Sequence, residues 1–430
     1  MKLNVGQAAD VRLGRQRAPQ YEFGDHVVPY LRSANVIDGE LDLSDVKRMN
    51  FTPAEQVLFR LRPGDVLVTE GSGSRDTVGI SAVWEDEIAA PVCFQNTLIR
   101  LRPRAGVTDG SYLAWWARHA RLSGQIAAVS SGANILHIGS DGLKRLQIDV
   151  PELEEQRRIV DFLDHRVSRI DWIIAARREQ LRAVREQFAS RRYLLVLGSD
   201  ASAVVESSLP WAPRMAHDRT IRRLSQIATM GTGHTPSKSN ADYWVDCDIP
   251  WLTTSDVHRF RRDEIDEITE TAHSISALGL ANSAAVLHPA GTVALSRTAS
   301  AGFSIVLGRD AATSQDFVTW TCGPDVEPYY LLAILRVMRP YLLGSLAMGS
   351  THKTIYFPDL MDLAIPVPPI EIQRSVIRGL DILSREFRAV EAQLSKQVDL
   401  LTEYKSSLIT AAVTGELDVT TADPAIPEQP

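Results

Sequence analysis

The stretch VPELEEQRRIVDFLDHRVSRID, at residues 150–171, decides the fold because the chain carries a second copy of it. The second copy, at residues 367–390, reads VPPIEIQRSVIRGLDILSREFRAV. Equivalent residues lie 217 positions apart over both copies, as in Pro151 and Pro368, Gln156 and Gln373, Glu186 and Glu403, and Gly198 and Gly415. This constant offset predicts two long helices of equal length.

Each copy repeats apolar residues every seven positions, with further apolar residues three positions later, which is the a/d spacing of a coiled coil. The seam of the first copy is Val160, Leu163, Val167, Ile170, Ile174, Leu181, Val184, Phe188 and Leu195. The seam of the second copy is Ile377, Leu380, Phe387, Leu394, Val398, Leu401, Leu408 and Ala412. A period of 3.5 residues, kept over about five heptads, favours packing against another helix over packing on a globular core.

Two charged residues interrupt the seam and provide a hypothesis for its register. Arg177 occupies a d position and Glu391 an a position. If the two helices run antiparallel about a pseudo-twofold axis, Arg177 lies opposite Glu391 near the middle. Alternatively, both side chains reach from the edge of the seam into water, and neither of them sets the register.

The composition is that of a globular protein with two or more cores. The 430 residues are 44% hydrophobic and 23% charged, and the length exceeds that of one ordinary domain. The three cysteines, Cys93, Cys247 and Cys322, lack a CxxC spacing, so we expect neither disulfides nor a zinc site. No apolar run has the length of a membrane span. We therefore expect a cytoplasmic protein without a membrane segment or a bound metal.

The net charge of −7 argues against a general attraction to nucleic acids. It does not exclude a local basic surface, because arginines are dense between residues 157 and 192. These arginines can equally be the solvated flank of a coiled coil.

Residues 1–150 predict a mixed α/β domain. The stretch SYLAWWARHARL, at residues 111–122, has the periodicity of a helix. Short runs rich in β-branched and aromatic residues predict strands at residues 28–36, 65–70, 79–84, 96–101 and 146–150.

Residues 220–366 repeat the order of the first domain. IPWLTTSDV, from residue 249, corresponds to VPYLRSANV, from residue 28, and GTVALSRTAS, from residue 291, corresponds to GDVLVTEGSG, from residue 64. The repetition predicts a second domain of the same architecture.

The order of segments defines the expected fold class. Periodicity is lost in a predicted linker, and the last residues predict a disordered tail. The predicted segments are a domain (1–150), a helix (151–198), the linker (199–219), a domain (220–366), a helix (367–418) and the tail (419–430). We expect an α+β fold in which two similar mixed α/β domains are separated by two long antiparallel coiled-coil helices, with internal pseudo-twofold symmetry.

The sequence carries no catalytic motif. A GxxxxGK[ST] phosphate loop is absent, and GSGSRD, from residue 71, lacks the third glycine of a dinucleotide-binding loop. The ten histidines show no HExxH spacing. Ser296 and His352 can be imagined as a nucleophile and its base, but no nucleophile elbow or oxyanion site accompanies them. We expect no active site in this chain.

The predicted arrangement suits the recognition of DNA. Two similar domains joined by a pair of helices can contact two separated short sites, as symmetric dimers contact two half-sites. The helices would span roughly 50 Å between residues 160 and 195, or about 15 bp of duplex. Because the domains differ in sequence, the target should be bipartite and asymmetric. The alternatives are a protein-interaction scaffold that does not bind DNA and an unrecognised enzyme.

Polar loops at matched positions of the two domains provide the candidate DNA contacts, because base edges are read by Arg, Lys, Asn, Gln, Ser and Thr side chains. The candidates of the first domain are Arg32, Ser33, Asn35, Ser72, Ser74, Arg75, Asn134 and His137. Those of the second domain are Thr235, Ser237, Lys238, Thr253, Thr254, Arg297, Thr298, Ser300, His352 and Lys353. Gln95 and Gln315 form a further matched pair that can instead be satisfied inside the fold. Each of these residues can also be an ordinary turn residue.

The duplicated VPxLExQRRIVxFLD motif, the coiled-coil helices and the exit YKSSLITAAVTGEL, at residues 404–417, resemble the conserved regions of type I restriction-modification specificity subunits. The stretch IATMGTGHTPSK, at residues 227–238, resembles the entry to a target recognition domain of that family. The resemblance covers nearly the full length. One departure is that the first domain has GRQRAPQYEFGDHV, at residues 14–27, in place of a GxTPSK-like entry.

The resemblance implies a DNA-binding subunit without its own active site. Each target recognition domain would read one half of a split double-stranded DNA target, and the helices would set the spacing. Two methyltransferase subunits, which bind S-adenosylmethionine and methylate adenine, would dock on this chain. Restriction and translocase subunits that use ATP and Mg would join them for cleavage. The resemblance thus implies no cofactor in this chain itself.

Overall fold

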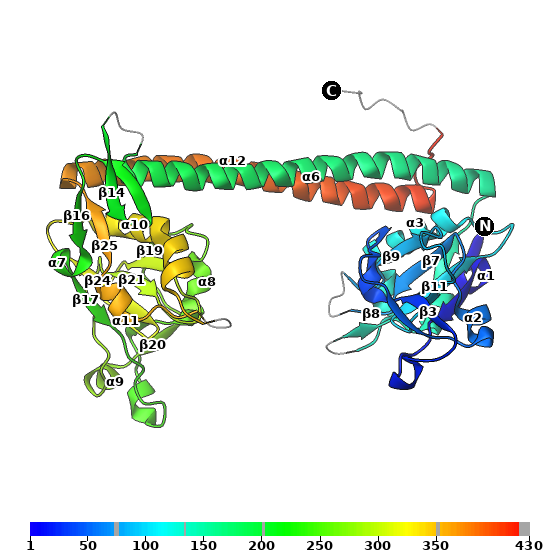
Figure 1. Ribbon diagram of the computed structural model, residues 1–430, viewed down its shortest axis with the longest axis horizontal. Coiled ribbons are helices and arrows are strands. Elements are labelled where there is room, and N and C mark those ends of the chain that lie inside the picture. The colour runs from blue at the N-terminus through cyan, green and yellow to red at the C-terminus, as the bar shows by residue number, and fades with distance from the viewer. Residues whose placement is uncertain (73–76, 133–134, 200–202, 350–352, 421–430) are drawn as a thin grey trace. The chain divides into compact units, whose positions relative to one another are not determined.

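The computed structural model describes residues 1–72, 77–132, 135–199, 203–349 and 353–420 (Figure 1). Its internal packing divides the chain into two compact units: unit 1 comprises residues 1–179 and 395–430, and unit 2 comprises residues 180–394. Each unit contains one mixed α/β domain together with one part of each long helix. The long helices therefore share hydrophobic cores with the domains.

The domain of unit 1 contains the predicted strands and the predicted helix. Its main antiparallel sheet has the order β2 (Ala9–Leu13), β11 (Leu98–Pro103), β7 (Asp65–Thr69) and β9 (Ser81–Trp84). A second sheet has the order β10 (Cys93–Phe94), β3 (Val27–Leu31) and β6 (Lys47–Asn50), and β1 (Lys2–Asn4) pairs with β13 (Gln147–Asp149). Helix α3 (Gly110–Leu122) packs on the main sheet, with Tyr112 and Trp116 in the core.

Shorter elements complete unit 1. The short strands are β4 (Val36–Ile37), β5 (Glu40–Leu41), β8 (Gly71–Ser72) and β12 (Leu136–His137). The short helices are α1 (Val5–Ala8), α2 (Pro53–Phe59), α4 (Gln125–Val129) and α5 (Ser140–Arg145), with 3-10 turns at Pro19–Tyr21 and Ser33–Asn35. The predicted strand at 28–36 therefore ends at Leu31, because a 3-10 turn follows it.

Unit 2 repeats this plan. Its main sheet has the order β17 (Ala228–Thr232), β24 (Phe317–Cys322), β21 (Val293–Ser296), β22 (Ser304–Leu307) and β19 (Glu267–Ile268). The second sheet has the order β20 (His273–Ile275), β18 (Ile249–Leu252) and β23 (Ala312–Thr313), and β16 (Thr220–Arg223) pairs with β25 (Ala364–Val367). The helices are α7 (Leu224–Ile227), α8 (Val257–Phe260), α9 (Ala277–Ala281), α10 (Pro328–Tyr341) and α11 (Phe357–Met361), with 3-10 turns at Ala241–Trp244 and Thr254–Asp256 and a π-helical turn at Leu342–Leu346.

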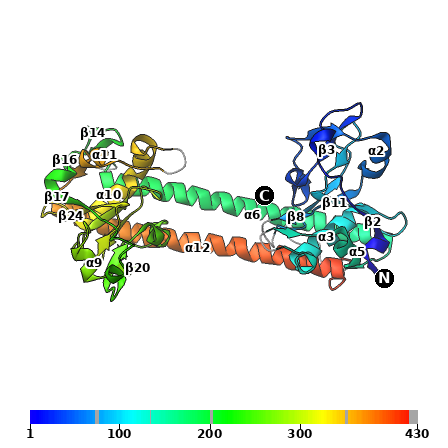
Figure 2. The same ribbon diagram turned by 90° about the horizontal axis from the view of Figure 1, so that it is seen from below.

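The two long helices are α6 (Leu153–Leu197) and α12 (Ile370–Thr414), which confirms the prediction of two helices of equal length. They lie side by side within each unit (Figures 1 and 2). Their last helical turns are followed by Gly198 and Gly415, whose φ angles of 62° and 74° are left-handed. Glycine adopts this conformation without the steric cost of a side chain. The matched glycines thus end both helices at equivalent points.

The predicted seam is mostly buried in unit 1 and mostly half-buried in unit 2, where Leu394 is its buried member. In unit 1, Leu163, Val167 and Ile170 join a core cluster that also contains Leu408 and Ala412 of α12. In unit 2, the rings of Phe188 and Phe387 stack with centroids 4.2 Å apart. Within each unit the early part of one helix faces the late part of the other, so α6 and α12 are antiparallel.

The predicted register between the two helices is wrong. The position of the partner of Glu391 differs from the predicted one: the Glu391 carboxylate lies 2.7 Å from the guanidinium of Arg185, eight residues beyond Arg177 along α6. The ion pair of Lys405 with Asp171, at 2.6 Å in unit 1, fits the same shifted alignment. A heptad seam can be displaced by seven residues without changing its a/d pattern. The apolar repeat therefore leaves the register open, and stacking and ion pairs select it.

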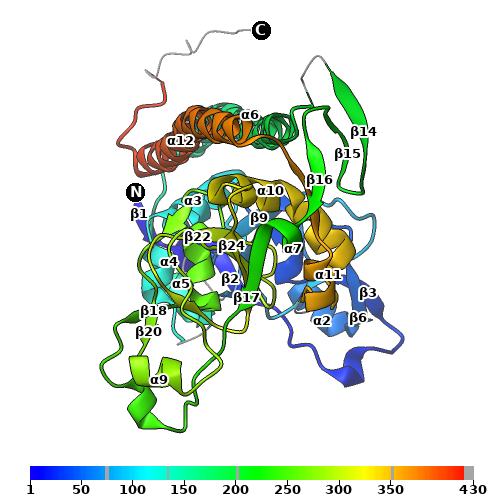
Figure 3. The same ribbon diagram turned by 90° about the vertical axis from the view of Figure 1, so that its left-hand side faces the viewer.

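The predicted linker at 199–219 contains a β-hairpin of β14 (Val204–Leu209) and β15 (Ala212–Ala216). Leu209 and Ala212 are buried and pack with Leu197 at the end of α6. Figure 3 shows the hairpin beside β16. The alternation in this segment is too short to be recognised in the sequence, and burial on the helix end stabilises it. Of the predicted tail, residues 421–430 lie outside the described residues.

A buried glutamine joins each long helix to its domain. Gln156 and Gln373 are both 0% exposed. The side-chain oxygen of Gln156 accepts a hydrogen bond of 2.8 Å from the backbone nitrogen of Asp109, and its amide nitrogen donates to the carbonyl oxygens of Val107 and Pro151. Gln373 makes the same three bonds, to Glu327, Asp325 and Pro368. The duplicated glutamine thus satisfies the peptide groups that precede α3 and α10.

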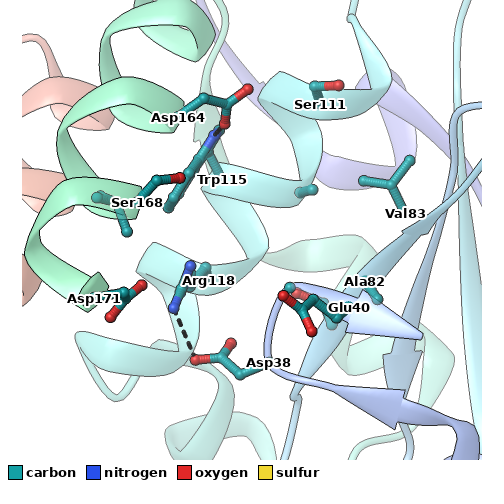
Figure 4. A pocket seen from close by; sticks show the side chains of 14 residues that line it. Asp38, Glu40, Ala82, Val83, Ser111, Trp115, Arg118, Asp164, Ser168 and Asp171 are labelled. Atoms are coloured by element: carbon teal, nitrogen blue, oxygen red, sulfur yellow. Dashed lines mark hydrogen bonds and ion pairs between the residues drawn. The ribbon is translucent and has the colours of Figure 1, made fainter. Parts of the chain in front are cut away.

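An acidic side chain clamped by two arginines provides a second junction in each unit. In unit 1, Asp38 accepts from Arg118 at 3.1 Å and from Arg121 at 2.7 Å, both on α3. Figure 4 shows Asp38 and Arg118 facing each other in a pocket of about 320 Å³, which Trp115 and Asp164 also line. Trp115 donates a hydrogen bond of 2.9 Å to Asp164 of α6, so the pocket lies between α3 and the long helix.

The equivalent clamp of unit 2 is more deeply buried. Asp263 lies 2.6 Å from Arg339 and 3.4 Å from Arg336, both on α10, and 3.0 Å from Arg192 on α6. Burial by itself would raise the pKa of Asp263, but the three arginines outweigh it and hold this pKa below its ordinary value of 3.8. A pocket of about 330 Å³ adjoins this clamp as well.

Replacing the buried glutamine tests the first junction. We expect Gln156→Leu to lower the free energy of unfolding by about 3 kcal/mol, because it leaves buried peptide groups without partners. The matched control Gln393→Leu, at an exposed position of α12, should change it by less than about 0.5 kcal/mol. Urea denaturation of the full chain measures both variants. Equal effects of the two substitutions would contradict the assigned role.

Replacing Asp263 tests the second junction. We expect Asp263→Asn to cost about 3–5 kcal/mol at neutral pH, because three arginines lose their carboxylate. A carboxylate with a depressed pKa contributes stability above its unfolded pKa of 3.8 and loses it as the pH falls through its folded value. In denaturation measurements, the free energies of unfolding of Asp263→Asn and wild type should therefore approach each other only below about pH 4. Asp381→Asn, at an exposed ion pair, is the control and should show little difference at any pH.

Candidate functional site

Each unit carries a polar cleft beside its smaller sheet, and these two clefts are equivalent in position and size. The cleft of unit 1 has a volume of about 600 Å³ and that of unit 2 about 620 Å³. Unit 1 lines its cleft with Arg17, Ala18, Pro19, Glu22, Tyr30, Arg32, Lys47, Arg48, Met49 and Gln95. Unit 2 lines its cleft with Thr235, Lys238, Trp244, Trp251, Thr253, Thr254, Ser255, His273, Ser274, Ser314, Gln315 and Asp316.

The smaller three-stranded sheet of each domain contributes residues to its cleft. In unit 1, Leu31 of β3 pairs in parallel with Phe94 of β10. In unit 2, Leu252 of β18 pairs in parallel with Thr313 of β23. The residues that follow these four positions leave the sheet together at one edge, so their side chains line the cleft.

A 3-10 turn after the central strand has the same construction in both domains. In unit 1, the side-chain oxygen of Asn35 accepts from the backbone nitrogen of Arg32 at 3.1 Å. In unit 2, the carboxylate of Asp256 accepts from the backbone nitrogen of Thr253 at 3.0 Å. Arg32 and Thr253 are thereby held at equivalent points of the two clefts.

The prediction of Asn35 as a DNA contact is wrong. Its side chain is 2% exposed, and its amide nitrogen donates to the carbonyl oxygens of Asp42 and Asp45. Asn35 therefore stabilises the turn. Ser33 and Thr254 are partly exposed on the same turns, and their contact with DNA remains a prediction.

A glycine loop closes each cleft from the N-terminal side. Gly14 lies so close to β10 that a Cβ would stand 2.1 Å from the carbonyl oxygen of Gln95, and at Gly233 it would stand 1.8 Å from that of Thr313. The next residue donates a backbone hydrogen bond to the same strand in both units. The first domain thus has a structural counterpart of the GxTPSK-like entry, although only the glycine is shared. This loop carries Arg17 into the cleft of unit 1.

The predicted pairing of Gln95 with Gln315 is displaced by one residue. The backbone nitrogen of Gln95 donates to the carbonyl oxygen of Leu31, and in unit 2 it is Ser314 that donates to Leu252. Gln95 therefore corresponds to Ser314. Sequence similarity favoured the wrong alignment because both stretches contain a glutamine next to a short strand. Both glutamines nevertheless line their clefts.

The cleft of unit 1 is basic. Arg17, Lys47 and Arg48 are exposed, and Arg32 is partly exposed. Asp45, at the same site, accepts from Lys47 and from Arg32 at 2.6 Å each. The hydrogen bond from Lys47 lowers the pKa of Asp45, although burial opposes the shift, and Arg32 lowers the pKa further. The cleft thus has four cationic side chains and two carboxylates. One carboxylate, Glu22, belongs to the lining, and the other, Asp45, bridges Arg32 and Lys47.

The cleft of unit 2 is nearly uncharged and richer in aromatic and hydroxyl groups. The rings of Trp244 and Trp251 meet edge to face, with centroids 5.6 Å apart. The hydroxyl of Thr235 donates to the side-chain oxygen of Gln315 at 2.6 Å. Its lining contains one lysine, Lys238, one aspartate, Asp316, and one histidine, His273. Ser237 lies beside it, since its carbonyl oxygen accepts from Trp244 at 3.1 Å. The two clefts therefore differ chemically although their frames match.

The loops that carry the remaining candidates are also held in the same way in the two domains. The backbone nitrogen of Ile138 donates to the carbonyl oxygen of Glu70 in unit 1, and that of Ile355 donates to the carbonyl oxygen of Arg297 in unit 2. In unit 2, Arg297 donates to the carbonyl oxygen of Gln315, and Thr298 donates to Asp316 at 2.8 Å, so this loop adjoins the cleft. The other described candidates bond locally: Ser72 with Thr77, His137 with Glu70, Ser300 with Thr298 and Lys353 with Leu343. Ser74, Arg75, Asn134 and His352 lie outside the described residues.

The described residues offer little for other chemistry. Within the described ranges, no group of three or more His, Cys, Asp or Glu side chains could hold a metal ion. Ser296, imagined as a nucleophile, is completely buried, and its proposed base His352 is outside the part of the chain that the structure describes. Among the described helices, none is long and apolar enough to cross a membrane.

The sequence and the fold together define the class of protein. The family described as "Type I restriction modification DNA specificity domain" matches this chain at residues 27–183 and again at residues 217–400. The chain belongs to this family and carries two copies of its domain. The prediction of the specificity subunit of a type I restriction-modification system is thereby confirmed.

Named relatives agree with this assignment. The chain is 22% identical over 421 residues to the type I restriction enzyme StySPI specificity subunit of Salmonella potsdam, and 22% identical over 401 residues to the EcoKI specificity subunit of Escherichia coli K12. Each alignment covers 91% of this chain and 83% of the relative. A solved structure from work on complex assembly and conformational transition of the type I R-M system has a TM-score of 0.74 at 18% identity, covering 97% of this chain and 98% of that one. The fold class is confirmed.

Several cleft residues were missing from the sequence-based candidates. Arg17, Lys47 and Arg48 belong to two segments that show no similarity between the domains, so the comparison of matched loops passed over them. Trp244 and His273 were missed for the same reason. The basic GRQRAP segment was the available signal, because it occupies the position of the GxTPSK-like entry.

The charge difference between the clefts predicts a difference in salt dependence. If the exposed cations of unit 1 contact phosphates, the double substitution Arg17→Gln and Arg48→Gln should reduce the slope of log K against log salt by about 1.8, or about 0.9 per contact. Fluorescence anisotropy between about 50 and 200 mM salt measures the slope. The control Arg158→Gln removes an exposed charge from α6, outside the clefts, and should leave the slope unchanged. An unchanged slope in the double variant would contradict phosphate contacts by these arginines.

Proposed function

We propose that this specificity subunit binds a bipartite, asymmetric double-stranded DNA target, with each cleft reading one half. The observation that carries the proposal is the pair of clefts, which have matching frames and nearly equal volumes but different side chains. Matching frames give the two halves of the target the same mode of contact. Different side chains give them different sequences.

The side chains of the clefts suit the edges of base pairs. Arginine and lysine donate to guanine, glutamine bonds to adenine, and serine and threonine bond to several bases. These types supply most of the polar lining in both clefts. The backbone of each cleft edge is held by the sheets and the 3-10 turns, so the side chains project from a rigid frame.

The partners follow from the class of protein. The StySPI and EcoKI relatives are named as specificity subunits of type I restriction enzymes. By analogy, this chain docks two methyltransferase subunits that bind S-adenosylmethionine, and restriction subunits that use ATP and Mg. It then supplies the DNA contacts and the scaffold, and its partners supply the catalysis. A scaffold without DNA binding is disfavoured, because it would leave the two polar clefts without a role.

Sequencing of methylated DNA tests the function. A host that expresses this chain together with its methyltransferase should carry methylated adenine in a split, asymmetric motif, and a host without this chain should lack it. Exchanging residues 220–366 for those of a related subunit should change one half of the motif and leave the other half intact. If the partners assemble but no methylation depends on this chain, the proposed function is wrong and the scaffold becomes the better account.

A further inference from the structure

One arginine in the lining of the unit 1 cleft, Arg32, is held by a carboxylate. The Nη2 atom of Arg32 lies 2.6 Å from Oδ2 of Asp45. The second oxygen of the same carboxylate lies 2.6 Å from Nζ of Lys47. One carboxylate thus positions two cations, each through its own oxygen.

The backbone of Arg32 is fixed as firmly as its side chain. Its nitrogen donates to the buried Asn35, and its carbonyl oxygen accepts from the backbone nitrogen of Asn35 at 2.8 Å. The Nε atom of Arg32 is also buried. The guanidinium is therefore held at its base by the turn and at one terminal nitrogen by Asp45, which reduces the entropy that ordering would cost on binding.

The rest of the guanidinium faces the cleft. The side chain of Arg32 is 26% exposed and lines the cavity of about 600 Å³. Asp45 engages one hydrogen of Nη2, and the described residues provide no hydrogen-bond acceptor for Nη1. Nη2 has a second N–H group and Nη1 has two, and a guanidinium can present such groups as a planar pair of donors. Such a pair matches the O6 and N7 acceptors that guanine presents in the major groove.

We propose that Arg32 reads a guanine in the half-site bound by unit 1, and that Asp45 is the positioning residue for this contact. The inference rests on the proposed function and names the base that one side chain recognises. The equivalent position of unit 2 is Thr253, which is uncharged and 8% exposed. Unit 2 therefore has no counterpart of this contact, and the guanine belongs to one half of the target.

A base edge fits Arg32 better than a phosphate does. An anionic phosphate at the guanidinium would lie close to Asp45, and like charges at short range repel each other. The edge of guanine is neutral, so it can accept from the same donors without this repulsion. Arg17, which makes no ion pair with any described residue, is the better candidate for a phosphate.

Variants of the full chain, expressed with the methyltransferase, test the assignment in two steps. The methylated motif of wild type is determined first, and each G·C pair in the unit 1 half is then replaced singly in a duplex for fluorescence anisotropy. We expect Arg32→Gln to weaken binding of the intact motif by about 10- to 100-fold. For the duplex in which one particular G·C pair is replaced, the affinities of Arg32→Gln and wild type should be equal. The methylated motif of Arg32→Gln should relax at that position alone.

Asp45→Ala separates positioning from general stability, because Asp45 is an exposed side chain that contributes no core packing. It should weaken binding to the intact motif and strengthen binding to unrelated DNA, since it removes a negative charge. A purely structural role for Asp45 would weaken both. Arg48→Gln is the matched control in the same cleft: it should weaken all duplexes by a similar factor and leave the motif unchanged.

Two results would overturn the assignment. One is that recognition of no G·C pair in the unit 1 half-site depends on Arg32. The other is a uniform loss of binding by Arg32→Gln on every duplex, which would mark a phosphate contact. Both leave the proposed function intact, because wild type still directs methylation to a motif. Absence of any motif that depends on this chain would instead refute the proposed function.

Discussion

The structure depends on a buried side-chain amide that occurs twice. Gln156 and Gln373 lie near the start of each long helix, and each forms three hydrogen bonds to its domain and to the proline before the helix. A fully buried amide is stable only when its donors and acceptors are satisfied. These bonds have a directional geometry that apolar packing lacks. They therefore fix how each helix leaves its domain.

The acidic clamps act at the same junctions but differ between the units. Asp38 holds two arginines of α3, whereas Asp263 holds two arginines of α10 and a third from α6. The third arginine makes the domain of unit 2 share an ion-pair network with the long helix. The common plan of the chain thus tolerates different electrostatics at equivalent places, because the backbone frame is set by the amides and the sheets.

The same separation of frame and chemistry holds in the clefts. Asn35 and Asp256 cap the same turn, and Gly14 and Gly233 allow the same close approach of two backbones. The side chains that these elements present are unrelated: cations in unit 1, and tryptophan with hydroxyl groups in unit 2. A specificity subunit needs this separation, because its target halves must be able to change without disturbing the fold.

The sequence by itself determined the duplication, the two long helices and the main strands, because these are written in periodic patterns and in a constant offset. The class of protein followed from the resemblance of its motifs to a known family. The sequence could not determine the helix register, since a heptad seam matches itself after seven residues and only the contacts of Arg185 with Glu391 and of Phe188 with Phe387 select one alignment. It also could not separate Asn35, a buried cap, from Arg32, a cleft side chain three residues away. Local sequence records which polar residues a turn contains, whereas tertiary packing decides which of them face solvent. The sequence therefore proposed part of the cleft lining, such as Arg32, Lys238 and Thr253, and the tertiary structure decided which of the candidates line the clefts.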